Sequence, residues 1–161
     1  MSDQALIEQL AGICMTRSLR VVTAESCTGG MVAAALTSIA GSSAWFDRGY
    51  VTYANRAKQD CLGVPEALIA THGAVSEQVA KVMASGAIAA SGADVCIAIT
   101  GIAGPDGGTQ DQPVGTVWFA CQMGEHLVAR CEQFSGDRDA VRNAARHGAI
   151  TFMLENLELS S

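Results

Sequence analysis

The feature that most limits the fold is an apolar stretch that ends in a polar, glycine-containing turn and is followed at once by a helical pattern. Leu19–Ala24 form the apolar stretch, Glu25–Gly30 the turn, and Met31–Ile39 an alanine-rich segment with helical spacing. A buried strand, a tight turn and a helix in this order open an α/β unit. We therefore expect a central sheet that is covered by helices.

The later segments extend this pattern. Asp94–Thr100 form a second apolar strand, which runs into the glycine- and proline-rich stretch Gly101–Gly108, and Tyr50–Tyr53 have the residue types of a strand. Val114–Gln122 and Glu125–Gln133 predict two strands of a hairpin. Helices are expected near residues 3–16, 76–90 and 138–157. The predicted fold is a three-layer α/β/α sandwich with a mixed, largely parallel sheet, in a single domain over residues 1–161.

Composition excludes several classes of function. With 49% apolar and 16% charged residues, the chain can bury a sizeable core and is not a disordered tail. Its net charge of -6 disfavours nucleic-acid binding, which depends on neutralising phosphates. The six cysteines lack zinc spacing and lie mostly in apolar runs, as in a reducing compartment, so no metal site is expected. No cofactor is expected either. Without a signal peptide or a membrane span, a cytoplasmic protein is expected.

In open α/β sheets, ligands bind beyond the carboxyl ends of the strands, so the turns at residues 25–30, 41–43 and 101–108 are candidate sites. The first turn offers hydroxyls and backbone amides at a predicted helix start, which suits an anion, or it simply caps that helix through Ser26 or Thr28. Cys27 is either a nucleophile activated by the helix terminus or a small residue that fills the turn. The residues alone leave both alternatives open.

Two further groups could carry chemistry. A serine such as Ser43 needs a neighbouring base, and Tyr53 or Lys58, one of only two lysines, could supply it from above a strand end. The alternative is that Ser43 caps a turn, the Tyr53 ring packs against its neighbours, and the Lys58 amine is solvated. Arg138 and Arg142 continue with Arg146 as a stripe at i, i+4 and i+8, which indicates either an anion clamp or an ordinary solvated helix face.

Several motifs, in the same order along about residues 5–155, resemble the CinA C-terminal domain family. They are Thr23–Gly30, Gly41–Phe46, Tyr50–Tyr53 with Asn55 and Lys58, His72–Ser76, Thr100–Gly108, Pro113–Val117 and Phe134–Arg138. Stand-alone members of this family are similar to nicotinamide-nucleotide amidases, which hydrolyse nicotinamide mononucleotide (NMN) to nicotinate mononucleotide and ammonia. The resemblance implies an amidohydrolase of this kind, without a metal. The additional N-terminal domain of longer members is not expected here.

The resemblance also implies residue roles. It makes Ser43 the nucleophile, Tyr53 and Lys58 its activating pair, and Thr100 and Arg138 substrate-binding residues. We further expect the NMN phosphate on amides of the Ser26–Gly30 turn or on arginines, a pyridinium ring near a carboxylate, and an oxyanion held by backbone amides of a glycine-rich turn. The substrate-binding candidates are thus Glu25, Ser26, Thr28, Gly29, Gly30, Thr100, Gly101, Gly104, Asp106, Arg138 and Arg142.

Two alternatives to this activity stay open at this point. The same anion-binding turns would serve a non-catalytic nucleotide-binding or regulatory module, related to competence or the response to DNA damage. A general amidase with another small substrate is the third reading. The expected partner is a small nucleotide rather than a nucleic acid or a membrane, and the alanine-rich helices would allow a homodimer.

Overall fold

The computed structural model describes residues 1–160, and a mixed five-stranded sheet in the order β2-β1-β3-β4-β5 forms its centre. The strands are β1 (Val21–Glu25), β2 (Phe46–Val51), β3 (Val95–Gly101), β4 (Thr116–Met123) and β5 (His126–Gln133). β1 pairs in parallel with β2 and β3, whereas β4 is antiparallel to both β3 and β5. The predicted mixed sheet with a hairpin in the C-terminal half is confirmed.

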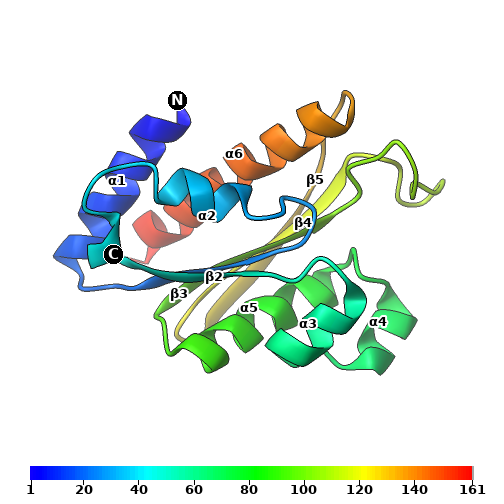
Figure 1. Ribbon diagram of the computed structural model, residues 1–161, viewed down its shortest axis with the longest axis horizontal. Coiled ribbons are helices and arrows are strands. Elements are labelled where there is room, and N and C mark those ends of the chain that lie inside the picture. Colours follow the sequence, from blue (N-terminus) through cyan, green and yellow to red (C-terminus); the bar gives the residue numbers. More distant parts are fainter. Residues whose placement is uncertain (161) are drawn as a thin grey trace.

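Helices cover both faces of this sheet (Figure 1). On one face lie α1 (Asp3–Thr16), α2 (Met31–Leu36) and α6 (Arg138–Leu159), and on the other lie α3 (Asn55–Leu62), α4 (Glu66–His72) and α5 (Glu77–Ser91). This arrangement confirms the predicted three-layer α/β/α sandwich. Among the described residues, no helix has the length and apolar character needed to cross a membrane.

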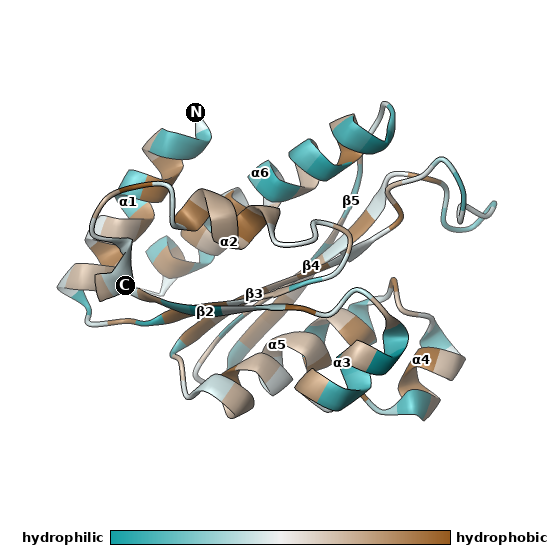
Figure 2. Ribbon diagram, in the orientation of Figure 1, coloured by the Kyte–Doolittle hydropathy of each residue, from teal (hydrophilic) through white to brown (hydrophobic). Residues whose placement is uncertain are grey.

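The central strands are buried because both of their faces are covered. Along β3, Ile97 and Ile99 point into the core shared with α1 and α6, whereas Cys96 and Ala98 point into the core shared with α5. Hydrophilic and hydrophobic residues alternate along α1, α3 and α6 in Figure 2, as expected for helices with one face on a core. The near-continuous apolar runs of the sequence therefore become the doubly covered centre of the sheet.

One glycine allows α3 and α5, which cover the same face of the sheet, to approach each other closely. A Cβ atom added to Gly86 in α5 would lie 1.9 Å from the backbone oxygen of Leu62, at the end of α3. Only a residue without a side chain fits there. The contact sets α3 tightly against α5, and α3 is the helix that carries Lys58.

The strand β2 differs from the predicted strand at Tyr50–Tyr53, because it begins at Phe46 and ends at Val51. Its limits follow from pairing with the five residues of β1, from Val21 opposite Phe46 to Glu25 opposite Val51. The helix α2 likewise ends at Leu36, before the predicted end at Ile39. These limits decide which neighbouring turns lie at which end of the sheet.

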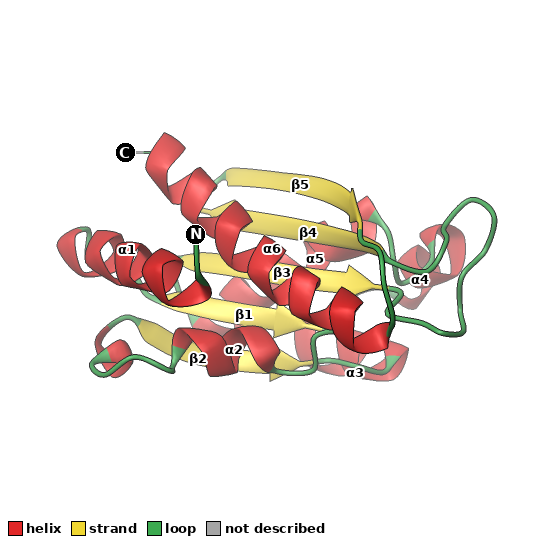
Figure 3. Ribbon diagram, turned by 90° about the horizontal axis from the view of Figure 1, so that it is seen from above, coloured by secondary structure: helices red, strands yellow, loops and turns green. Residues whose placement is uncertain are grey.

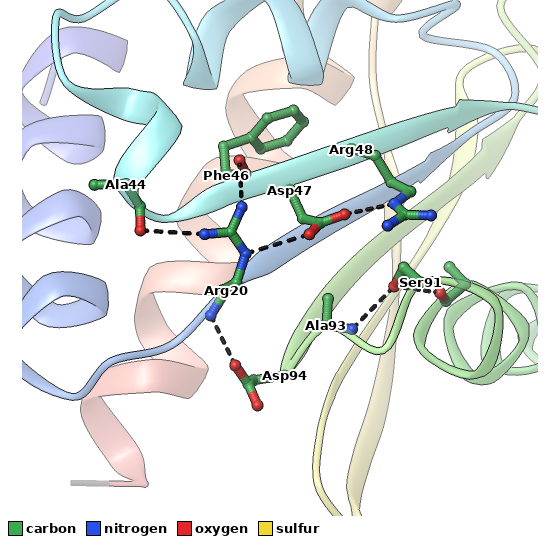
Figure 4. A network of polar contacts seen from close by, with 9 residues as sticks. Arg20, Ala44, Phe46, Asp47, Arg48, Ser91, Ala93 and Asp94 are labelled. Atoms are coloured by element: carbon green, nitrogen blue, oxygen red, sulfur yellow. Dashed lines mark hydrogen bonds and ion pairs between the residues drawn. The ribbon is translucent and has the colours of Figure 1, made fainter.

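Because β1, β2 and β3 are parallel, the turns that follow them meet at one edge, here called the carboxyl edge (Figure 3). Their starts form the opposite, amino edge, where Arg20 joins the strands (Figure 4). The Arg20 guanidinium donates to Asp47 Oδ2 at 3.2 Å, and its backbone amide donates to Asp94 Oδ2 at 2.8 Å. The 3-10 turn η1 (Ser42–Ala44) lies just before β2, at this amino edge.

Candidate active site

A cavity of about 280 Å³ opens at the carboxyl edge of the sheet. Its walls come from the turns after β1, β2 and β3, from the loop between α4 and α5, and from the first residue of α6. The lining residues are Ser26, Cys27, Tyr53, Asn55, Lys58, Ala74, Val75, Thr100, Gly101, Ile102, Ala103, Gly104, Asp106, Gly107 and Arg138. The cavity lies where ligands bind in open α/β sheets.

Lys58 is the most unusual residue of this cavity, because its side chain is only 1% exposed. Its Nζ donates to Ser26 Oγ at 3.0 Å, to the Thr52 carbonyl at 2.9 Å and to the Tyr53 carbonyl at 3.1 Å. The two carbonyls lie immediately beyond β2, and Lys58 follows them in the first turns of α3. The end of the strand and the start of the helix thus hold the amine against the Ser26 hydroxyl.

Burial lowers the pKa of the Lys58 amine from 10.5 to about 8. Desolvation is the cause, since taking the amine out of water disfavours its charged form. Within residues 1–160 no carboxylate forms an ion pair with Lys58 to restore that charge. At pH 7 on the order of a tenth of the lysine is therefore neutral and able to accept a proton.

The hydroxyl beside Lys58 belongs to Ser26, in the turn after β1. The Ser26 side chain is buried but lines the cavity, and its backbone amide donates to the Ile99 carbonyl of β3 at 2.9 Å. This bond ties the turn to the neighbouring strand. Ser26 thus presents a hydroxyl to the cavity from a fixed backbone, within hydrogen-bond distance of a buried amine.

The structure corrects the prediction for Ser43. This residue is exposed in η1, before β2, whereas Tyr53 and Lys58 follow β2. A six-residue strand spans roughly 20 Å at about 3.3 Å per residue, so Ser43 lies at the opposite edge of the sheet from the other two. Ser43 is also absent from the cavity walls. The hydroxyl that folding brings to Lys58 is that of Ser26 instead.

Tyr53 contributes to the site in two ways. Its carbonyl accepts the Lys58 hydrogen bond, while its side chain is 58% exposed at the cavity mouth. There the phenol oxygen accepts a hydrogen bond from Arg138 Nη2 at 2.9 Å, and Arg138 Nη1 donates to the Gly104 carbonyl at 2.8 Å. The phenol thus pairs with Arg138, and among the described residues no hydrogen bond joins it to Ser26 or Lys58.

The structure narrows the predicted anion seat, because the Gly30 amide and the first amides of α2 already have a partner within the protein. The fully buried Glu25 carboxylate accepts hydrogen bonds from the backbone amides of Gly30, Val32 and Ala33 at 2.9–3.2 Å. The Thr28 hydroxyl donates to the same carboxylate at 2.7 Å. These amides are therefore not available to a substrate phosphate. Glu25 and Thr28 instead hold the turn that presents Ser26.

Gly29, Gly30 and the Cys27 side chain shape the rest of the turn. Gly29 and Gly30 have positive φ angles of 57° and 102°, which let the backbone turn sharply into α2. Burial raises the pKa of the Cys27 thiol to about 12, so this residue stays a neutral thiol. Its carbonyl accepts a hydrogen bond from Arg142 Nε at 3.1 Å.

The three arginines of the stripe on α6 contact three different parts of the protein. Arg138 lines the cavity, whereas Arg142 braces the turn at Cys27 from outside the cavity. Arg146 pairs with Asp3 of α1 at 2.6 Å. Of the predicted arginine clamp, only Arg138 is placed to meet a ligand in this cavity.

The predicted residues after β3 do lie at the cavity. Thr100, Gly101, Gly104 and Asp106 all line it, and the buried Thr100 hydroxyl donates to the Ala74 carbonyl at 2.9 Å. At Gly101 an added Cβ would lie 2.7 Å from Val117 Cγ2 and 3.0 Å from Cys27 Sγ, so only glycine keeps the cavity wall unchanged.

Three lining residues that were given no site role lie outside the turns named as candidate sites. They are Asn55, Ala74 and Val75. Asn55 precedes Lys58 by three positions in α3, so helical spacing could have placed both on one face. Ala74 and Val75 belong to a loop whose position depends on the packing of α4 and α5, which the residues themselves do not reveal.

Comparison with known proteins decides the family. Residues 3–157 match the family described as the CinA C-terminal domain. The chain belongs to this family. It is 55% identical over 155 residues to the nicotinamide-nucleotide amidohydrolase PncC of Escherichia coli K12, with 93% of each chain covered. It is 52% identical over 136 residues to the protein of the same name from Pseudomonas putida, with 84% of this chain and 85% of that protein covered.

Solved structures of the family agree with this fold. The crystal structure of the competence damage-inducible protein A from Klebsiella pneumoniae superposes with a TM-score of 0.94 at 39% sequence identity, and 98% of each chain is covered. A CinA C-terminal domain is therefore the scaffold that presents the cavity, with Ser26 and Lys58 in it.

Proposed function

We propose that this protein is an amidohydrolase that converts NMN to nicotinate mononucleotide and ammonia, with Ser26 as nucleophile and Lys58 as its base. The observation that carries the proposal is the 3.0 Å contact between Lys58 Nζ and Ser26 Oγ inside a cavity at the carboxyl edge. The names of the relatives from E. coli and P. putida support the substrate. The role that resemblance gave to Ser43 passes to Ser26.

The hydrogen bonds of Lys58 suggest how the proton moves. When the amine is neutral, its two N–H bonds still donate to the Thr52 and Tyr53 carbonyls, and its lone pair faces Ser26. The Ser26 hydroxyl then donates to that lone pair. As Ser26 Oγ bonds to the carboxamide carbon, Nζ takes the hydroxyl proton and becomes an ammonium.

Lys58 next returns this proton to the amide nitrogen, the C–N bond breaks, and ammonia leaves an ester on Ser26. A water molecule then attacks the ester carbon while Lys58 accepts one proton from the water. Ser26 Oγ leaves and regains that proton. The sum is one amide and one water converted to one carboxylic acid, which ionises, and one ammonia. The lysine therefore serves as base and acid in turn, which suits its pKa of about 8.

The oxyanion needs donors that are already in position. In a turn that presents a nucleophilic serine, the amide of the following residue serves this purpose, and here that residue is Cys27. Glu25 holds the turn from one side through α2, and Arg142 holds it from the other through the Cys27 carbonyl. A turn fixed in this way costs little reorganisation as charge develops on the substrate oxygen.

Charge at the cavity suits a zwitterionic nucleotide. Arg138 at the mouth is the cation for the NMN phosphate, and its bonds to Gly104 and Tyr53 hold the guanidinium in place. Asp106 is the only acidic residue among those that line the cavity within residues 1–160, and so it replaces Glu25 as the carboxylate for the pyridinium ring. Thr100 supports the site through Ala74 rather than through substrate.

Release of ammonia and nicotinate mononucleotide from NMN by the purified protein tests the function, and a pair of serine variants tests the mechanism. Ser26→Ala should lower kcat by about 10³-fold or more, as loss of a nucleophile does, while NMN still binds. Ser43→Ala is the matched control and should keep kcat within about twofold.

The opposite result, an active Ser26→Ala and an inactive Ser43→Ala, would refute the assignment of the nucleophile. Binding of NMN by the wild-type protein without any ammonia release would instead support a non-catalytic nucleotide-binding module.

A further inference from the structure

The long loop between β3 and β4, residues 102–115, projects beyond the carboxyl edge and forms one wall of the cavity (Figures 1 and 3). Two backbone hydrogen bonds close its base, from Ile102 N to the Thr116 carbonyl at 2.9 Å and from Gly115 N to the Ile102 carbonyl at 2.7 Å. Its residues 105–111 are all exposed. The outer part of this wall therefore has little packing of its own to hold it over the cavity.

Gln112 directly follows this exposed stretch. Its side chain is half-buried, and its Nε2 donates to the Val75 carbonyl at 2.7 Å, across 37 positions of sequence. Within the loop, Gln112 N donates to Thr109 Oγ1 at 3.0 Å, and Thr109 N donates to the Gln112 carbonyl at 2.8 Å. The tip of the loop is thus a closed turn that a single amide side chain attaches to the loop between α4 and α5.

The segment that receives this bond is itself a wall of the cavity. Ala74 and Val75 line it, and three successive carbonyls there are each bound by a different side chain. The Gly73 carbonyl accepts from Ser76 Oγ at 2.8 Å, the Ala74 carbonyl from Thr100 Oγ1 at 2.9 Å, and the Val75 carbonyl from Gln112 Nε2. Of these three donors, only Gln112 comes from the projecting loop.

We propose that Gln112 is a positioning residue for substrate binding, which fastens the 102–115 loop to the 73–76 loop so that Asp106 and Gly107 stay over the cavity. Arg138 anchors the same loop at Gly104, on the other side of these two residues. Gln112 does not line the cavity that holds Ser26 and Lys58, so its bond sets how often the wall is in place rather than how the amide is cleaved. This inference rests on the proposed function.

The kinetic test compares variants of neighbouring residues in NMN turnover. Gln112→Ala should raise KM for NMN about three- to tenfold, the loss expected for one net hydrogen bond, with kcat within about twofold. Gln112→Glu should be no better, because a carboxylate cannot donate to the Val75 carbonyl. Gln112→Lys restores a donor and should recover much of the KM. The exposed Gln110→Ala is the matched control and should leave both parameters unchanged.

Amide hydrogen exchange in the absence of substrate tests the attachment independently of any activity. Residues 73–76 and 105–112 should exchange several-fold faster in Gln112→Ala than in Gln110→Ala, and Gln112→Lys should reverse the increase. A KM for Gln112→Ala equal to that of Gln110→Ala, or equal exchange in the two variants, would overturn the proposal. If the wild-type protein does not turn over NMN, the proposed function fails, and exchange alone decides whether Gln112 holds the wall.

Discussion

Both edges of the parallel strands carry basic side chains, but these differ in burial and in ionic partners. At the amino edge, Arg20 and Arg48 lie at the surface, and each forms an ion pair with Asp47 (Figure 4). At the carboxyl edge, Lys58 is buried beside Ser26 with hydroxyl and carbonyl partners only. An ion pair at the surface keeps both of its groups charged at neutral pH. A buried amine without an ionic partner loses its proton more easily and can then activate a hydroxyl.

The sharpest test of this comparison removes the amine at the carboxyl edge. Lys58→Met keeps the apolar stem and should lower kcat for NMN by about 10³-fold or more, since Ser26 loses its base. Lys81 is the matched control, because it forms only a surface pair with Glu77. Lys81→Met should leave kcat unchanged and shift the free energy of unfolding by under about 1 kcal/mol. Equal turnover in the two variants would contradict the role of Lys58.

The pH profile tests the same lysine without a substitution at the site. In the free enzyme Lys58 must be neutral, so kcat/KM should rise about tenfold per pH unit below its pKa of about 8 and level off above it. Stability should change in the same direction. Between about pH 8 and 10.5 the unfolded chain binds a proton at Lys58 that the folded chain lacks, so this residue makes the free energy of unfolding rise with pH. A profile flat from pH 6 to 9 would exclude Lys58 as the base.

Removing one carboxylate at each edge tests how much that edge contributes to the free energy of unfolding. Glu25→Ala removes the acceptor of three buried or half-buried amides and of Thr28, and it should cost about 2–4 kcal/mol in the free energy of unfolding. Asp47→Ala breaks surface ion pairs, which solvent screens, and should lower the free energy of unfolding far less than Glu25→Ala does. Chemical denaturation of the two variants measures both values. Similar losses would show that the Ser26 turn does not depend on Glu25.

A smaller effect is expected at the mouth of the cavity. Arg138→Ala should raise KM for NMN about 10- to 100-fold, the loss expected for a charge-assisted contact with a phosphate, and should change KM for nicotinamide riboside much less. Arg146 belongs to the same stripe but pairs with Asp3, so Arg146→Ala is the control and should leave KM unchanged. Equal increases for the two substrates would argue against a phosphate contact at Arg138.

Much of this architecture could be predicted because it depends on local patterns. The apolar runs at Leu19–Ala24 and Asp94–Thr100 became buried strands, and the glycine-rich stretch Gly101–Gly108 became a cavity wall. The parallel-sheet rule placed the site beyond the strand ends. Lys58 and Arg138 also line the cavity, although it was the resemblance to the family, not a local pattern, that gave them their expected roles.

The partner of Lys58 was not predictable in this way. Ser43 is 15 positions from Lys58 and Ser26 is 32 positions from it, yet the more distant serine makes the contact. The limits of β2 decide this, because a strand at Phe46–Val51 separates Ser43 from Lys58 by its whole length. The anion seat was narrowed for a related reason, since the Glu25 carboxylate accepts hydrogen bonds from the Gly30 amide and from the first amides of α2.

The amino-acid sequence by itself determined the layered α/β architecture and the turns that border a site, because burial and backbone preference act over a few neighbouring residues. Only the tertiary structure decided that the Ser26 hydroxyl contacts the buried Lys58 amine, and that the Glu25 carboxylate binds the first amides of α2. Those choices depend on the parallel pairing of β1 with β2 and β3, which brings together atoms that are far apart along the chain.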